Sequence, residues 1–387
     1  MHKNIGNLTL KRAQDSGGKP EKVLNWHLHS NEKEIMNKSE LLQIRLYNQL
    51  LAGCSLKEPQ QIVSWMGAIQ SQSLDLAKWA IGVRMGSKAV SDVDEALNTG
   101  KIIRTHILRP TWHFVSAEDI HWMFDLSNPR LKPIYRSYAR MRQVDEDLIY
   151  RTIPLLEKML QGGKHLTKSE INDELLSQDK VFDINVLNQI IHYAEMEGIL
   201  VNGQLKKKDQ TFTLLEEWVP RKQTVHKEEA LGLLARKFFT SHAPATLGDF
   251  VWWSGLTITE CKQAIGMIKS ELICETMNGR DFWLKSDLNI PPINGCSALL
   301  LPPFDEFVVS YKDRSELIKK THYGKVMTSN GLFSPTVMLD GEIVGSWKRK
   351  AVKGVPRVEL SFFEKIPKRI QQLYEPQIKL LEAFYSK

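Results

Sequence analysis

The sequence predicts an α+β protein made of tandem winged-helix units, each a helix-turn-helix with a β-hairpin wing, followed by a C-terminal β-rich, barrel-like domain. The first observation is a repeated order. Between residues 146 and 290, three stretches with apolar residues at helical spacing precede a hairpin of period two, and this order occurs twice. The second is a change near residue 291, where Pro-rich turns and alternating strand patterns begin. The third is length, because 387 residues exceed what one hydrophobic core usually serves.

These observations predict five segments. Residues 1–36 are polar, contain Gly17-Gly18 and are expected to form a flexible extension. The other expected segments are a first winged helix at 37–145, a second at 146–222, a third at 223–290, and a β-rich domain with a C-terminal helix at 291–387.

In the first winged helix, apolar spacing predicts a helix over residues 39–51 and another over residues 74–85. A helix that begins at Pro59 is expected between them, since proline is well tolerated in a first helical turn. Proline lacks the N–H that a central strand needs. Pro110 therefore predicts that residues 109–115 form an edge strand or wing rather than a buried strand.

The second winged helix begins with an amphipathic helix expected over residues 146–160. Thr167 and Glu170 have the spacing of a capping box, which predicts the start of a short helix. A third helix is expected over residues 185–197. The hairpin that follows is expected to turn at Asn202-Gly203 and to carry a basic tip.

The third winged helix repeats this order, with helices expected over residues 227–239, 246–255 and 259–269. Its hairpin is expected to turn at Asn278-Gly279, and a further hairpin in the last segment is expected to turn at Asp340-Gly341. An amphipathic helix over residues 366–385 is expected to close the chain.

The charge of the chain favours a nucleic-acid partner. The formal net charge is +7, and the basic residues are clustered. Clustered Lys and Arg neutralise phosphates and release counterions, so we expect binding to double-stranded DNA. A solubilising surface is the alternative explanation of the charge taken alone. The expected phosphate contacts in these clusters are Lys206, Lys207, Lys208, Lys348 and Arg349.

Several classes of protein are disfavoured. The four cysteines are scattered without Cys-x-x-Cys spacing, which argues against a zinc knuckle or a disulfide framework. No run reaches the roughly 18 apolar residues of a membrane span. Residues 1–36 also lack the apolar core of a signal peptide. We therefore expect a cytoplasmic protein with no membrane partner and no cofactor.

A pair of glutamines, Gln70 and Gln72, is the candidate chemical motif. Amide side chains donate and accept hydrogen bonds and never ionise, so a converging pair can hold a water or a base edge. Two solvated glutamines near a helix end are the alternative. Positions i and i+2 do not face each other in a regular helix, so the pair must lie at a helix end or an irregular turn to bind one water.

Several separated motifs occur in order along the chain: Gln70-Ser-Gln72, Arg109-Pro-Thr-Trp-His113, Asp249-Phe-Val-Trp-Trp-Ser-Gly-Leu256, Leu301-Pro-Pro-Phe-Asp-Glu306 with Tyr311-Lys-Asp-Arg314, and Asn330-Gly-Leu-Phe-Ser-Pro-Thr-Val337 with Gly345-Ser-Trp-Lys-Arg349. From about residue 38 to the C-terminus, the chain resembles the bacterial winged-helix DNA glycosylases of the AlkZ type. The resemblance implies tandem winged helices and a barrel-like domain. It also implies base excision repair, by hydrolysis of the bond between deoxyribose and purines alkylated at N7, including some interstrand crosslinks.

The resemblance implies that Gln70 and Gln72 are the catalytic pair, with Ser71 in place of the family's apolar middle residue. An N7-alkylated guanine is cationic and leaves without protonation, so the enzyme mainly needs to place a water and stabilise the sugar cation. Asp75 and Asp305 are candidates for a supporting role, and structural turn carboxylates are the alternative. No obvious Schiff-base lysine accompanies the glutamines, which predicts a monofunctional enzyme.

The run from His106 to His113 supplies further expected DNA contacts, namely His106, Arg109, Thr111 and His113. Each histidine taken alone is more often a structural residue, and the arginine can instead pair with a carboxylate. The spacing of His106, His113 and His121 matches no familiar metal motif, so no metal is expected.

A non-catalytic DNA-binding protein, such as a transcriptional regulator, is the competing interpretation. In it Gln70 and Gln72 would only hydrogen-bond to bases. Regulators usually dimerise over a palindrome, and the sequence contains no heptad seam that would support a dimer. Three units in one chain instead predict a monomer that wraps one duplex.

Overall fold

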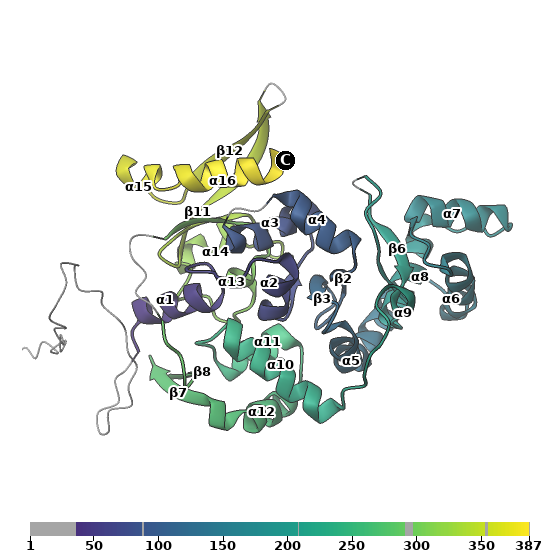
Figure 1. The fold of residues 1–387 in the computed structure, drawn as a ribbon, viewed down its shortest axis with the longest axis horizontal. Helices are drawn as coiled ribbons and strands as arrows, with labels where there is room; N and C mark the ends of the chain where they lie inside the picture. Colours follow the sequence, from purple (N-terminus) through teal and green to yellow (C-terminus); the bar gives the residue numbers. More distant parts are fainter. Residues whose placement is uncertain (1–35, 87–88, 208, 291–296, 353–354, 387) are drawn as a thin grey trace, which may run out of the picture.

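The computed structural model describes residues 36–86, 89–207, 209–290, 297–352 and 355–386. The expected flexible extension lies outside these ranges except for Met36, whose side chain is buried. The described chain is a mixed α/β structure (Figure 1). None of its described helices is long and apolar enough to cross a membrane.

The first part of the chain contains five helices and three short strands among its described residues. They are α1 (Lys38–Asn48), α2 (Pro59–Met66), β1 (Ile69–Gln70), α3 (Leu74–Met85), α4 (Val90–Asn98), β2 (Ile102–His106), β3 (Trp112–Ser116) and α5 (Ile120–Met141). The expected starts at Pro59 and Leu74 are confirmed. Gly86 ends α3 in the left-handed conformation at φ 75°, where a residue without Cβ is favoured.

The expectation that residues 109–115 form an edge strand or wing is wrong. The sheet order is β1-β3-β2, so β3 is the central strand, and it is buried from His113 onward. Pro110 does not interrupt the strand because it lies in the turn before Trp112. In this sheet Gln70 is the register partner of His113.

The second part contains three helices, a short closing helix and a three-stranded sheet of order β4-β6-β5. Its elements are α6 (Glu146–Leu160), β4 (Leu166–Thr167), α7 (Lys168–Ser177), α8 (Ile184–Met196), β5 (Leu200–Asn202), β6 (Thr211–Leu214) and α9 (Leu215–Trp218). The capping box of Thr167 and Glu170 is present at the start of α7. Figure 1 shows these elements together on one side of the molecule.

The expected turn at Asn202-Gly203 is misplaced. Asn202 is the last residue of β5, and its buried side chain accepts a hydrogen bond from Arg104. The loop instead reverses between Lys206 and Asp209, whose backbones exchange hydrogen bonds of 3.0 and 2.9 Å. Lys207 at this tip has a φ of 59°.

The third part matches its expected order closely. Its elements are α10 (Lys227–Ser241), α11 (Leu247–Ser254), α12 (Ile258–Met267), the 3-10 turn η1 (Lys269–Glu271), β7 (Leu272–Met277) and β8 (Arg280–Lys285). Thr246 and Thr257 cap α11 and α12 through capping boxes. Asn278 and Gly279 form the expected hairpin turn with φ values of 52° and 73°.

The last part contains a four-stranded sheet of order β12-β11-β10-β9. Its elements are β9 (Ala298–Leu301), α13 (Glu306–Val309), η2 (Lys320–His322), α14 (Tyr323–Val326), β10 (Thr336–Leu339), β11 (Glu342–Val352), β12 (Val355–Phe362), α15 (Lys368–Gln372) and α16 (Glu375–Ser386). The expected hairpin at Asp340-Gly341 is confirmed between β10 and β11.

Two expectations for the last part need correction. Over the described residues the sheet is open and not barrel-like, because β9 and β12 do not pair with each other and four strands are too few to close a barrel. The expected helix over residues 366–385 is two helices, α15 and α16. Pro376 in the first turn of α16 explains the break, since its ring would clash with the carbonyl of Gln372 in a continuous helix.

The buried hydrophobic side chains form two clusters among the described residues. The larger combines side chains from the first, third and last parts with Val201 and Leu215 of the second part, and it includes Trp79, Phe114, Phe238, Trp253 and Trp347. The smaller lies within residues 131–212. Helix α5 contributes to both, with Leu126 in the larger cluster and Leu131 in the smaller.

Candidate functional site

The glutamine pair lies in the short connection between β1 and α3. Gln70 ends β1 and is only 6% exposed, whereas Gln72 is exposed and precedes Ser73, the N-cap of α3. The motif is therefore at an irregular helix entrance. This is the kind of backbone in which two residues at i and i+2 can act on one molecule.

Both glutamines hydrogen-bond to the turn between β2 and β3. Nη2 of Arg109 donates to Oε1 of Gln70 at 3.1 Å, and the backbone N–H of Trp112 donates to Oε1 of Gln72 at 3.1 Å. Each amide oxygen keeps a second lone pair. The described residues give neither side-chain NH₂ group a partner, so both amides retain hydrogen-bonding capacity for another molecule.

The backbone of Ser71 fixes the pair in place. Its N–H donates to the carbonyl of Trp112 at 2.7 Å, and its carbonyl accepts from Nε and Nη2 of Arg104 at 3.1 and 2.9 Å. The same guanidinium lies 4.1 Å from the centre of the Trp112 ring. Burial lowers the pKa of Arg104 to about 10, so it stays a cation at neutral pH.

The β2–β3 hairpin beside the glutamines contains buried polar atoms without partners in the described chain. They are Nε of Arg109, Oγ1 of Thr111 and Nε2 of His113, and none has a hydrogen bond within the described chain. Nδ1 of His113 lies 2.9 Å from the carbonyl of Thr111, so only one side of this ring is satisfied. Buried polar groups are nearly always paired, and unpaired ones gathered in one place are typical of a functional site.

Burial changes the pKa values of His113 and Arg109, the two residues of this group that can carry a positive charge. Burial, together with the nearby charge of Arg109, lowers the pKa of His113 to about 3, so His113 is neutral at pH 7. Burial also lowers the pKa of Arg109, and the charge of Glu306 opposes this. Arg109 is the cation of the hairpin, because a guanidinium group keeps its proton in proteins, and His113 is a neutral ring.

Glu306 places a buried negative charge next to the motif. Its Oε1 accepts the backbone N–H of Gln70 at 2.7 Å, and its Oε2 accepts Nε1 of Trp253 at 3.1 Å and the hydroxyl of Ser310. Burial alone would raise the pKa of Glu306. The neighbouring His242, whose Nε2 lies 3.7 Å from Oε2 of Glu306, and the charge of Arg109 lower it to about 2. The carboxylate is therefore ionised at neutral pH.

The two carboxylates expected to support the glutamines have other partners. Asp75 is exposed and pairs with Arg349. Asp305 is fully buried and accepts two hydrogen bonds from Arg84, at 2.8 and 2.9 Å. Within the described chain neither is hydrogen-bonded to Gln70 or Gln72. The acid that does contact the motif is Glu306, the neighbour of Asp305.

The expected phosphate contacts are spread over distant elements, and most are already paired. Lys206 binds Glu170 at 2.6 Å, Lys348 lies 3.5 Å from Glu359, and Arg349 pairs with Asp75. Lys208 lies outside the described residues. Lys207 is exposed at the tip of the β5–β6 loop and has no ion pair with any described residue.

His106 is not hydrogen-bonded to either glutamine within the described chain. Its Nδ1 lies 3.2 Å from Oε2 of Glu195, and its ring packs 3.9 Å from the Trp112 ring, measured between centroids. A group of three described side chains could hold a metal ion, namely His106, His192 and Glu195. Sequence reasoning missed this group. The signal was His192-Tyr-Ala-Glu195, whose spacing of three puts both side chains on one helix face.

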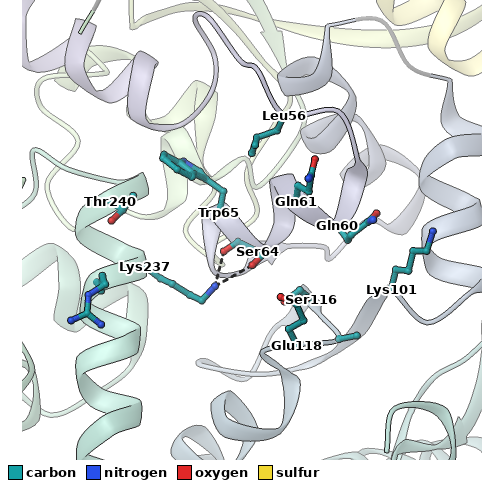
Figure 2. A pocket seen from close by; sticks show the side chains of 12 residues that line it. Leu56, Gln60, Gln61, Ser64, Trp65, Lys101, Ser116, Glu118, Lys237 and Thr240 are labelled. Atoms are coloured by element: carbon teal, nitrogen blue, oxygen red, sulfur yellow. Dashed lines mark hydrogen bonds between the residues drawn. The ribbon is translucent and has the colours of Figure 1, made fainter. Parts of the chain in front are cut away.

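A cavity of about 680 Å³ opens between α2, the end of β3 and α10 (Figure 2). Its lining includes Trp65, Lys101 and Glu118, and neither Gln70 nor Gln72 contributes to it. Nζ of Lys237 in this wall donates to the carbonyl of Ser64 at 2.8 Å. The cavity is therefore distinct from the glutamine motif.

Comparison with known proteins finds a matching family model and a similar solved structure. The family model described as "DNA glycosylase AlkZ-like" matches residues 63–384. The solved structure of the Streptomyces sahachiroi DNA glycosylase AlkZ has a similar fold, with a TM-score of 0.74 at 18% sequence identity, over 90% of this chain and 97% of that one. No curated protein sequence matches the chain.

Proposed function

The chain belongs to the AlkZ-like DNA glycosylase family and is a DNA glycosylase, and we propose that it hydrolyses the N-glycosidic bond of N7-alkylated or bulky purines in duplex DNA. In this proposal Gln70 and Gln72 position the attacking water. The family supports the reaction class, and the residues around the glutamines support the choice of site.

The observation that carries this proposal is the set of unsatisfied polar groups beside the glutamines. Arg109, Thr111 and His113 each have a buried polar atom without a partner in the described chain, and all three lie on the β2–β3 hairpin to which both glutamines are hydrogen-bonded. An unpaired buried polar group costs about 1–3 kcal/mol. A bound water or a sugar-phosphate would satisfy these groups.

The electrostatics suit departure of a cationic base. As the glycosidic bond breaks, positive charge develops on the sugar, and a fixed negative charge stabilises it. Glu306 supplies that charge behind Gln70, and His113 is neutral, so it adds no opposing charge. The glutamines then need only orient a water through their free lone pairs, since an N7-alkylated base leaves without protonation.

Arg109 and Thr111 have a complementary role in this scheme. Arg109 already holds Oε1 of Gln70, and we assign its Nε, which is buried and unpaired within the described chain, to a phosphate oxygen of bound DNA. We propose that the hydroxyl of Thr111 also hydrogen-bonds to the phosphate backbone of the DNA. A cation that holds both the motif and the DNA backbone would align the glycosidic bond with the water.

The three helix-and-hairpin parts would contact the DNA backbone as winged helices. In the second part, the sheet order β4-β6-β5 and the helices before it match the expected order of such a unit. Lys207 at the hairpin tip would reach a phosphate. We propose that one molecule acts as a monofunctional monomer, without a cofactor.

Incubation with a duplex that carries a single N7-methylguanine tests this function. We expect release of the free base and an abasic site that heat or alkali cleaves, with no release from the matched undamaged duplex. A protein that binds both duplexes equally and releases no base from a panel of N7-alkylated and bulky purine lesions would instead act as a non-catalytic DNA-binding protein.

A further inference from the structure

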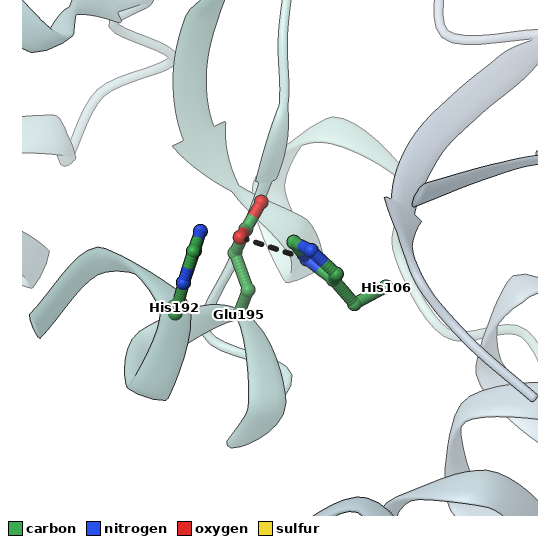
Figure 3. Close-up of side chains that lie close together, drawn as sticks. All are labelled: His106, His192 and Glu195. Atoms are coloured by element: carbon green, nitrogen blue, oxygen red, sulfur yellow. Dashed lines mark hydrogen bonds and ion pairs between the residues drawn. The ribbon is translucent and has the colours of Figure 1, made fainter. Parts of the chain in front are cut away.

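Three side chains from two separate elements converge away from the glutamine motif. His106 comes from β2, and His192 and Glu195 come from α8 (Figure 3). One nitrogen of each imidazole and one carboxylate oxygen all lie within 4.8 Å of one another. Figure 3 shows the carboxyl group of Glu195 between the two rings.

The local structure explains the convergence. Residues three apart lie on one face of a helix, so His192 and Glu195 project together from α8. His106 ends β2, which packs against α8, and its Nδ1 lies 3.2 Å from Oε2 of Glu195. The site thus joins the first part of the chain to the second.

We propose that His106, His192 and Glu195 bind a divalent transition-metal ion of the zinc type. Two neutral imidazoles and one carboxylate are a ligand set that Zn²⁺ accepts in proteins, with a further position open to water. Tetrahedral bonds of about 2.0–2.1 Å put ligand atoms roughly 3.3 Å apart.

The surroundings of Glu195 favour a cation at this place. The side chain is fully buried, and its hydrogen-bond partners within the described residues are His106 and the amide of Asn202 at 3.4 Å. No Lys or Arg of the described chain forms an ion pair with it. The nearby guanidinium of Arg104 is engaged by the carbonyl of Ser71 and by Asn202 and Gln210.

An ion can enter from one side. His192 is half-buried, and its ring nitrogens have no hydrogen-bond partner in the described chain. It lines a cavity of about 270 Å³ together with Trp112, Asn188 and Gln210. This cavity gives a water or another small ligand room at the open position of the ion.

A bound ion would also tie β2 to α8 beneath Trp112. The Trp112 ring packs on His106, and its backbone N–H holds Gln72. The ion is therefore expected to raise thermal stability. The metal proposal does not depend on the proposed reaction, because its tests measure binding and unfolding.

The test uses the full chain after treatment with a chelator, titrated with Co²⁺ and with Zn²⁺. We expect one equivalent of Co²⁺ to give the ligand-field absorption of a tetrahedral nitrogen and oxygen site, and Zn²⁺ to displace it. Zn²⁺ should also raise the thermal midpoint, because it binds only the folded state. His192→Ala should lower the affinity by about a hundredfold or more.

The matched control is His226→Ala, since His226 is exposed at the start of α10. It should bind Co²⁺ like the wild type. Glu195→Gln is the second variant, and it should also lose the absorption while remaining folded by circular dichroism. Absence of binding to the wild type, or equal binding by the wild type and His192→Ala, would overturn the proposal.

Discussion

The backbone N–H of Gln70 donates a hydrogen bond of 2.7 Å to Oε1 of Glu306, although 236 positions separate the two residues in the chain. The bond joins β1, which ends in the glutamine motif, to the first turn of α13. It puts an ionised, fully buried carboxylate directly behind the proposed water site. We infer that Glu306 both positions Gln70 and provides negative charge for the reaction.

Glu306→Gln tests this role. The substitution keeps the shape but removes the charge and places an NH₂ group among the donors from Gln70, Trp253 and Ser310. Loss of one charge-assisted bond should lower the free energy of unfolding by about 1.5–3 kcal/mol. Base excision per folded molecule should fall on the order of tenfold, measured in single-turnover assays with N7-methylguanine duplexes.

Asp305→Asn is the matched control for Glu306→Gln. It weakens the buried pair with Arg84, so it should lower the free energy of unfolding by about 3 kcal/mol or more. Excision per folded molecule should stay near the wild-type value. Equal loss of excision in both variants would mean that the carboxylates matter only for folding.

Ser71→Ala should stabilise the protein or leave it unchanged. The Ser71 side chain is fully buried and its hydroxyl has no partner in the described chain, which costs about 1–3 kcal/mol. Alanine removes the hydroxyl and retains both backbone hydrogen bonds. Urea unfolding should give a free energy equal to or up to about 1 kcal/mol above the wild type. A clear loss of stability would show that the hydroxyl has a partner.

His113→Asn should reduce the loss of stability in acid. The pKa of His113 is about 3 in the folded chain and about 6.5 when unfolded, so the unfolded state takes up the proton first. The contribution of the neutral His113 ring to the free energy of unfolding is complete above pH 6.5 and is lost as the pH falls toward 3. From pH 7 to pH 5 the wild type should lose on the order of 2 kcal/mol more than the variant, measured by urea unfolding. If the free energies of unfolding of the wild type and of His113→Asn changed with pH in parallel, the result would contradict a neutral His113.

Much of the secondary structure could be predicted because its signals are local. The helix over Glu146–Leu160 and the hairpin turn at Asn278-Gly279 follow from apolar spacing and from turn residues that accept positive φ. The errors have tertiary causes. Asn202-Gly203 has good turn chemistry, but Asn202 continues the strand because its side chain is held by Arg104. The four-stranded sheet stays open because too few strands are present to close it.

The candidate site was only partly accessible from the sequence. Gln70, Arg109, Thr111 and His113 are close in the chain and come together in one sheet and its turn. The contact of Glu306 with the motif depends on how distant segments pack, and no local pattern distinguishes it from Asp305. The convergence of His106 with Glu195, 89 positions away, is hidden for the same reason.

Binding to undamaged duplex DNA should weaken steeply with salt and depend little on sequence, because it relies on phosphate contacts. Lys207→Ala should lower the slope of log affinity against log salt by about 1. Lys206→Ala should change the slope less, since Lys206 is already paired with Glu170 at 2.6 Å. Fluorescence anisotropy over a salt series measures both slopes. DNA affinity that does not change with salt concentration, or that is high for a single palindrome only, would favour the interpretation as a transcriptional regulator.

The most direct test of the central claim is the single-turnover rate of N7-methylguanine release by Gln70→Ala and Gln72→Ala. If the two amides hold the attacking water, each variant should be slower by on the order of tenfold or more with little change in DNA affinity, because the lost hydrogen bonds act mainly in the transition state. Gln161→Ala, at an exposed glutamine that ends α6, should match the wild type. Wild-type rates in both motif variants would contradict the claim that Gln70 and Gln72 are catalytic.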